Sequence, residues 1–113
     1  MSIVEPFEPS DSDGFVVRRV DSGADVVLRL VGELDVAGIG TFNEATRHLP
    51  ARGHVRVDLS ELTFMDSTGI RVLMSLDLRS RAEQWTLTLH APQPQVLNVM
   101  RLCGFDQRFK MTQ

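Results

Sequence analysis

The sequence predicts a single α/β domain with a mixed, mostly parallel sheet of about four strands and three main helices. Four segments alternate apolar and polar residues with a period of two, as strands do, and three others repeat apolar residues every three or four positions, as helices do. Their order is strand, strand, helix, strand, helix, strand, helix. Strands that alternate with helices favour parallel pairing through right-handed crossovers, and the tight turn after the first strand makes that strand antiparallel.

The N-terminal residues 1–13 predict a flexible tail. They contain Pro6 and Pro9 and an acidic cluster at 11–13, and they show no sustained periodicity. The domain itself is therefore expected to span residues 14–113, which is long enough for one hydrophobic core.

Two strands and a helix are expected in the first half of the domain. The strands cover residues 15–20 and 24–31, and the turn between them has the composition Asp-Ser-Gly that tight turns favour. Asp35 follows the second strand and is placed to cap the next helix. Apolar residues then recur at helical spacing from about 38 to 49, and Pro50 is expected to end that helix.

The centre of the chain, residues 54–81, predicts a strand, a short connection and a second helix. Val55 and Val57 alternate with charged residues in the strand. The helix opens at Asp-Ser-Thr-Gly, where the side chain of Asp66 or Ser67 can accept a hydrogen bond from the first-turn N–H groups. The Ser67 hydroxyl is expected near the surface, close to the positive end of the helix dipole.

The last part of the chain predicts a fourth strand and a third helix. The strand covers residues 85–90, and the helix starts at Pro94 and places Cys103 on its apolar side, as a buried thiol. Phe105 and Phe109 are expected to fold back onto the core.

Composition excludes several classes of protein. The net charge of −3 and the pI near 5.5 argue against binding nucleic acid or an anionic membrane surface. No apolar run reaches the roughly 18 residues of a membrane span, and the N-terminus lacks the features of a signal peptide. A single cysteine fits a reducing compartment, so a cytoplasmic protein is expected.

The sequence shows no motif for a metal, a cofactor or a catalytic nucleophile. Its three histidines are scattered, no glycine-rich phosphate loop is present, and Ser67 has no obvious base. We therefore expect a binding module and not an enzyme. One alternative stays open: Asp58 and Asp66 form a carboxylate pair at a strand end, suited to a Mg²⁺-dependent or nucleotide-binding phosphoacceptor. Otherwise they are an ordinary strand residue and a helix cap.

The second helix carries more apolar residues than one buried face needs. One stripe, sufficient to pack on the sheet, consists of Val72, Leu73, Leu76 and Ser80. A second line lies on a neighbouring face and consists of Ser67, Ile70, Met74 and Leu78, with Arg71, Ser75 and Arg79 beside it. The second line predicts either a docking surface for another protein or a helix that is buried on two sides.

These residues resemble a known family. Gly-Glu-Leu-Asp at 32–35, Val-Asp-Leu at 57–59 with Phe-Met-Asp-Ser-Thr-Gly-Ile at 64–70, and the helix ending in Gly-Phe at 94–105 resemble the motifs of STAS-domain anti-sigma factor antagonists. The resemblance covers roughly residues 15–110. It implies the fold described above and a role in partner switching.

The resemblance also implies a mechanism. The unphosphorylated antagonist binds an anti-sigma factor that is also a serine kinase, and a sigma factor is released; phosphorylation ends the interaction, and a serine phosphatase restores it. By position the phosphorylated residue is Ser67. The implied partner surface consists of Asp35, Asp66, Ser67, Thr68, Gly69, Ile70, Arg71, Met74 and Leu78. Arg71 departs from the small residue that the family often has there.

Physical chemistry is consistent with such a switch, since a phosphate adds about −1.5 to −2 charges to a docking face. A second function within the same fold is a scaffold or transporter-associated subunit that never cycles through a kinase. The sequence alone does not predict the oligomeric state.

Overall fold

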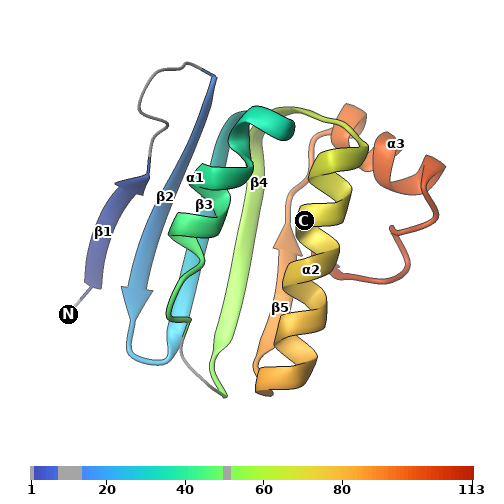
Figure 1. The fold of residues 1–113 in the computed structure, drawn as a ribbon. Coiled ribbons are helices and arrows are strands. Elements are labelled where there is room, and N and C mark those ends of the chain that lie inside the picture. The colour runs from blue at the N-terminus through green and yellow to red at the C-terminus, as the bar shows by residue number, and fades with distance from the viewer. Residues whose placement is uncertain (1, 8–13, 50–51) are drawn as a thin grey trace.

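A six-stranded sheet forms the body of the molecule in the computed structural model, which describes residues 2–7, 14–49 and 52–113. The strands stand side by side in chain order, and three α-helices and one short 3₁₀ helix connect them (Figure 1). The elements are β1 (Ser2–Phe7), β2 (Phe15–Ser22), β3 (Asp25–Leu34), η1 (Val36–Gly38), α1 (Ile39–Ala45), β4 (His54–Met65), α2 (Ser67–Glu83), β5 (Thr86–His90), α3 (Pro94–Leu102) and β6 (Lys110–Thr112).

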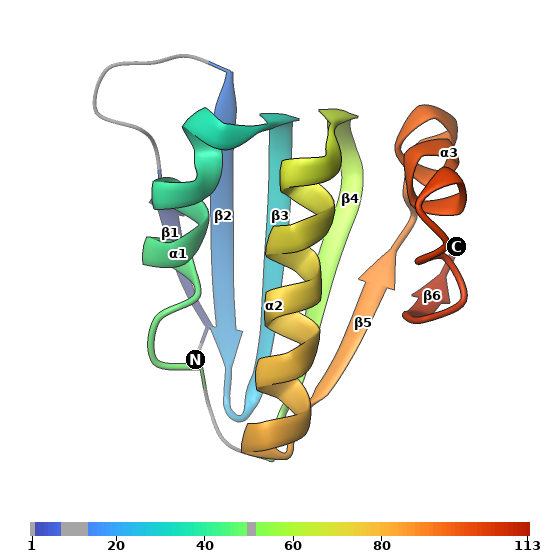
Figure 2. The same cartoon turned by 45° about the vertical axis from the view of Figure 1, so that its right-hand side comes forward.

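The predicted fold class is confirmed. β1, β2 and β3 pair antiparallel, and β3, β4, β5 and β6 pair parallel. Both views place α1 and α2 on the same face of the sheet, as right-handed crossovers in one direction require (Figures 1 and 2). α3 lies apart from them, beside the edge that β5 and β6 form.

Two strands lie where the sequence analysis expected none. The prediction of a flexible tail over residues 1–13 is wrong for Ser2–Phe7, which pairs with β2 along its whole length; residues 8–13 lie outside the described residues. Pro6 does not prevent this pairing, because an edge strand need not donate every backbone N–H. The short β6 adds a further edge beside β5.

The central strand is longer than predicted. β4 continues through the expected connection as far as Met65, because β3 also extends and pairs with it up to Leu34. Two register shifts in this pair absorb the extra residues, as β-bulges do. As a consequence, β3 and β4 end side by side at the same edge of the sheet.

The helix after β3 is shorter than predicted. α1 ends at Ala45, and the Thr46 hydroxyl donates to the carbonyl oxygens of Phe42 and Asn43 at 3.0 and 3.3 Å. Leu49 is nevertheless buried, as its position in the apolar pattern predicted. Pro50, which was expected to end this helix, lies outside the described residues.

The core lies between the sheet and the helices, and it consists of the inward-facing residues of the strands together with one stripe of each helix. Leu73, Leu76 and Ser80 of α2 are buried, and Val72 is half-buried, so the predicted packing stripe is confirmed. Phe109 is buried and Phe105 packs against the core, as expected.

A buried arginine attaches α1 to the sheet. The Arg19 guanidinium of β2 donates to the carbonyl oxygens of Ala45, Arg47 and His48 at 3.0, 2.7 and 3.3 Å, and it forms a two-point ion pair with Asp21. The last carbonyl groups of a helix have no hydrogen-bond donors within the helix, and the Arg19 side chain supplies donors to them here.

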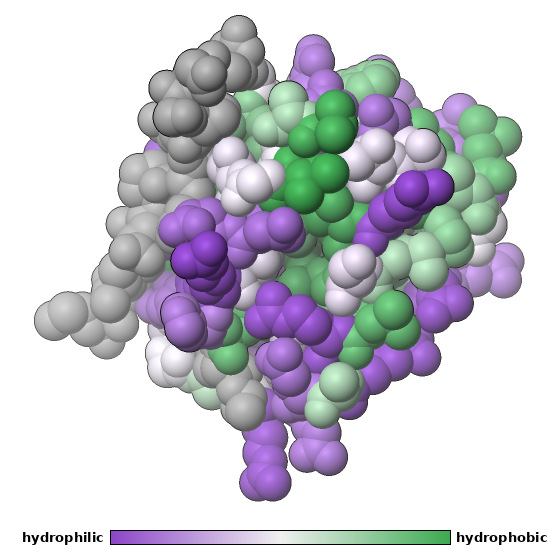
Figure 3. Space-filling view, viewed as in Figure 1, coloured by the Kyte–Doolittle hydropathy of each residue, from purple (hydrophilic) through white to green (hydrophobic). Residues whose placement is uncertain are grey.

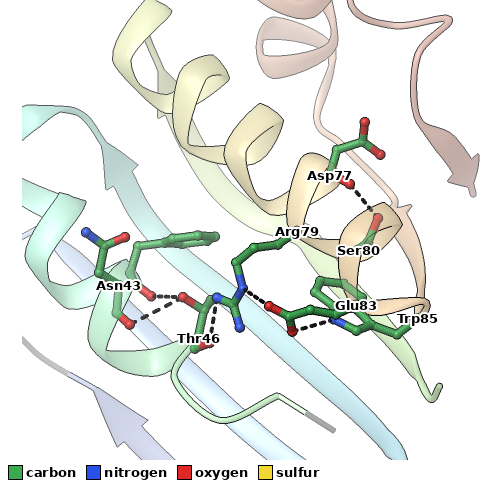
Figure 4. Close-up of polar contacts among 8 residues, drawn as sticks. Asn43, Thr46, Asp77, Arg79, Ser80, Glu83 and Trp85 are labelled. Atoms are coloured by element: carbon green, nitrogen blue, oxygen red, sulfur yellow. Dashed lines mark hydrogen bonds and ion pairs between the residues drawn. The ribbon is translucent and has the colours of Figure 1, made fainter. Parts of the chain in front are cut away.

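A second polar network joins α1 to α2 (Figure 4). Arg79 of α2 donates to the Thr46 carbonyl oxygen at 2.9 Å and to the Glu83 carboxylate at 3.2 Å. Glu83 also accepts from the Trp85 indole N–H at 3.1 Å. These hydrogen bonds, from Trp85 first and then from Arg79, hold the pKa of Glu83 below its ordinary value. The two helices that cover the sheet are thus fixed relative to each other.

Candidate functional site

Two aspartates follow the paired ends of β3 and β4. Leu34 and Met65 are register partners, so Asp35 and Asp66 leave the same edge of the sheet from neighbouring strands. Asp35 accepts from the N–H of Ala37 at 3.0 Å and begins η1, which confirms its predicted capping role. In parallel α/β sheets, the carboxyl ends of neighbouring strands are where binding sites gather.

The start of α2 presents a hydroxyl to solvent. The Asp66 carboxylate is the N-cap and accepts from the N–H groups of Thr68 and Gly69 at 2.9 and 3.2 Å. Ser67 is the first residue of the helix and is exposed, whereas Thr68 is half-buried. Because Asp66 already caps the helix, the Ser67 hydroxyl is not required for that purpose.

Gly69 brings α2 close to the strand ends. A β-carbon at this position would lie 2.3 Å from the Cγ of the buried Met65 and 3.1 Å from the carbonyl oxygen of Leu34. A side chain would therefore push the helix start away from β3 and β4. Gly69 thus lets the first turn of α2 pack against the ends of β3 and β4, and Gly69 itself is buried.

We expect that Asp66→Ala lowers the free energy of unfolding by about 1 kcal/mol, because two helix N–H groups lose their acceptor. Asp66→Asn is the matched variant: its amide oxygen still accepts, so most of the stability should remain. Urea denaturation of the two variants measures the difference. Equal losses in both would show that the cap is not what stabilises the helix start.

The exposed face of α2 differs from the predicted docking line. Ser67, Arg71, Ser75 and Leu78 are exposed, and they lie on one side of the helix; we refer to them as the α2 face. Leu78 lies within about 20° of Ser67 around the helix axis and about 16 Å along it.

Ile70 was predicted to lie on the docking line, and this is wrong. Its side chain is only 1% exposed and belongs to the core, because it is turned toward the buried side of α2. Met74 is half-buried and packs against the core, so its side chain is only partly accessible to a partner. The helix is therefore buried over a wider arc than one stripe, and Leu78 is the large apolar residue left exposed on it.

Sequence reasoning missed two exposed apolar residues at this end of the molecule, Val36 and Phe64. Val36 begins η1 directly after Asp35, and 71% of its surface is exposed. The space-filling view shows hydrophobic side chains gathered between α1 and the N-terminal end of α2 (Figure 3). The exposure of Val36 could have been predicted from the sequence, since an apolar residue directly after a capping aspartate begins a helix at the surface.

The structure does not bring Asp58 and Asp66 together. Seven residues of β4, positions 59–65, lie between them, so the two Cα atoms are roughly 25 Å apart. Asp58 accepts from the Ser60 N–H at 2.9 Å and from Arg29 at 3.3 Å. Burial raises the pKa of Asp58, but the hydrogen bonds from Ser60 and Arg29 outweigh burial and hold that pKa below its ordinary value. Within the described residues, no group of three or more potential metal ligands occurs. The carboxylates of Asp58 and Asp66 therefore do not share a site, as the phosphoacceptor alternative would require.

Cys103 was predicted to be buried, and it is exposed. α3 ends at Leu102, and the backbone turns away at Gly104, so the helical repeat that would bury the thiol does not continue. Among the described residues, no helix is long and apolar enough to cross a membrane.

The fold and the helix start can be compared with known proteins. An anti-sigma factor antagonist from Mycobacterium paratuberculosis superposes with a TM-score of 0.73 at 20% identity, over 91% of this chain and 89% of that one. The anti-sigma factor antagonist SpoIIAA in its unphosphorylated form superposes with a TM-score of 0.66 at 20% identity, over 86% of this chain and 88% of that one. An antisigma-factor antagonist STAS domain from Rhodobacter sphaeroides superposes with a TM-score of 0.56 at 24% identity, over 67% of this chain and 85% of that one. The molecule thus has the same α/β fold as these proteins.

The sequence comparisons define the family. A family model described as "Mlab, STAS domain" matches residues 17–113, and a STAS-domain containing protein of Pseudomonas aeruginosa (strain UCBPP-PA14) is 25% identical over 92 residues, covering 80% of this chain and 90% of that protein. The chain belongs to the STAS-domain family, as its motifs predicted.

Proposed function

We propose that this protein is a cytoplasmic anti-sigma factor antagonist that is controlled by phosphorylation of Ser67. In its unphosphorylated form it binds an anti-sigma factor with serine kinase activity and so frees a sigma factor. Phosphorylation by that kinase ends the binding, and a serine phosphatase restores it. The protein acts as a binding module in this cycle.

The observation that carries the proposal is the exposed Ser67 hydroxyl in the first turn of α2, beside a cap that Asp66 supplies. A kinase needs a hydroxyl that it can reach without unfolding the helix, and the Ser67 side chain meets this need. The half-buried Thr68 meets it less well. The likeness to SpoIIAA, whose unphosphorylated form is a defined state of that protein, supports the same assignment.

The proposed partner surface combines the strand ends and the α2 face. Asp35 and Asp66 follow paired strand ends, and exposed apolar area is supplied by Val36, directly after Asp35, and by Leu78 on the α2 face. Exposed apolar side chains near a polar centre are typical of a protein interface. A dianionic phosphate placed there would have to be desolvated beside the Asp66 carboxylate, at a cost of several kcal/mol in the interface. Release therefore needs no change in the fold.

We expect one phosphate to be added to the native protein by the anti-sigma kinase and ATP, and none to Ser67→Ala. Ser67→Ala should still bind the kinase, because the hydroxyl is a small part of the surface. Intact mass and peptide mapping after incubation with candidate anti-sigma kinases of the same cell locate the phosphate. A phosphate that persists in Ser67→Ala, on Thr68 for example, would contradict the assignment of the acceptor.

A non-cycling STAS scaffold or transporter-associated subunit is the second candidate. The match to the family model described as "Mlab, STAS domain" is compatible with it. It predicts stable partner binding with no phosphate transfer from any kinase, and the same mass measurement distinguishes the two functions.

A further inference from the structure

Among the side chains that the structure describes, one cation of the α2 face has no hydrogen-bond or ion-pair partner. Arg71 is exposed, one helical turn after Ser67, and no hydrogen bond or ion pair of its side chain occurs within residues 14–49 and 52–113. The other two arginines of α2 differ from it: Arg79 and Arg81 each form an ion pair with an acidic side chain of the same helix. Arg71 is therefore an unmatched charge in a helix whose other charges are matched.

The neighbours of Arg71 on the helix explain why it is unmatched. Residues three and four positions apart are in reach of each other, and at these positions Arg71 has Ser67, Thr68, Met74 and Ser75. None of the four is acidic. Three of them, Ser67, Thr68 and Ser75, carry hydroxyls that become strongly acidic groups when they are phosphorylated. Ser67 and Thr68 lie on the N-terminal side of Arg71, and of these two Ser67 is the exposed one.

We propose that Arg71 binds the phosphate group on phosphorylated Ser67 and forms an ion pair within α2. The inference rests on the proposed phosphorylation of Ser67. An acidic group four residues before a basic one is the favourable order on a helix, and a guanidinium can donate two parallel hydrogen bonds to a phosphate. Both side chains are exposed on one face, so they meet without any movement of the backbone.

The pairing makes phosphorylation change two groups of the partner surface at once. The phosphate brings negative charge, and it also engages a cation that is available to the partner in the unphosphorylated protein. The phosphate itself becomes easier to ionise, because the nearby guanidinium stabilises the dianion. This lowers the second pKa of the phosphate, which is about 6 for an isolated phosphoserine.

The test uses protein with phosphoserine incorporated at position 67 during translation, so that it needs no kinase. A phosphorus NMR titration at about 0.1 M salt measures the second pKa of the phosphate. We expect this pKa to be lower in the protein with Arg71 than in its Arg71→Gln variant by about 0.2 to 0.4 unit, the size of effect that a helix ion pair produces. Arg71→Lys should give an intermediate value.

Arg81→Gln is the matched control. Arg81 is also exposed on α2 but lies about 21 Å along the helix from Ser67, beyond the range of unscreened charge at this salt concentration. The phosphate pKa should be unchanged in that variant. An equal pKa with Arg71 and with Arg71→Gln would overturn the inference and leave the proposed function intact. A Ser67 that no anti-sigma kinase phosphorylates would instead overturn the proposed function.

Discussion

Leu78→Asp should abolish binding of the anti-sigma factor while the domain stays folded. The side chain is 56% exposed and lies on the α2 face in line with Ser67, so it has no role in the core. In a complex the new carboxylate would be buried without a partner, which costs several kcal/mol and weakens binding by 100-fold or more, on the order of magnitude expected for an unpaired buried charge. Isothermal titration against the partner measures the loss.

Leu102→Asp is the matched control for this result. Leu102 is also an exposed leucine, at 79%, but it ends α3, away from α2 (Figure 2). We expect unchanged affinity in that variant. If both substitutions weaken binding equally, the α2 face is not the interface.

Met74→Asp is not a suitable test of the same surface. From the sequence, Met74 was expected to be exposed on the docking line, so that an aspartate would block binding only. Because the side chain packs against the core, the aspartate should also lower the stability of the domain. Circular dichroism would show this loss, and Leu78 therefore replaces Met74 as the site to change.

Arg19→Met should lower the free energy of unfolding by about 3 kcal/mol, the largest stability effect that we expect for a charged residue of this protein. The substitution removes the donor to three carbonyl oxygens at the end of α1 and leaves the Asp21 carboxylate without its cation. Urea denaturation measures the change.

Arg18→Met is the control from the adjacent position. Arg18 is exposed on the opposite face of β2, so its loss should change the stability by no more than about 0.5 kcal/mol. Similar losses in the two variants would show that the buried hydrogen bonds of Arg19 contribute little.

The contrast between Arg18 and Arg19 shows where sequence reasoning stops. Both are arginines in a strand, and alternation predicts that one of them faces the helices. Alternation cannot predict that the inward one is satisfied, since its acceptors are carbonyl groups 26 to 29 residues later in the chain. Such a contact exists only after α1 has packed on β2.

The sequence by itself determined the alternation of strands and helices, the antiparallel start of the sheet, and the helix start at Asp66 and Ser67. Each of these follows from local chemistry: periodicity, turn composition and capping act over a few residues. The same local chemistry placed the exposed hydroxyl at Ser67.

Only the tertiary structure decided which parts of α2 are available to a partner. Ile70 and Met74 read as one line with Leu78 in the sequence, yet the first is in the core, the second is partly covered, and the third is exposed. The reason is physical: how wide an arc of a helix is buried depends on the sheet, the strand ends and the neighbouring helix that pack around it. The length of β4 and the pairing of Ser2–Phe7 have the same origin, because a strand extends as far as its neighbour offers hydrogen-bond partners.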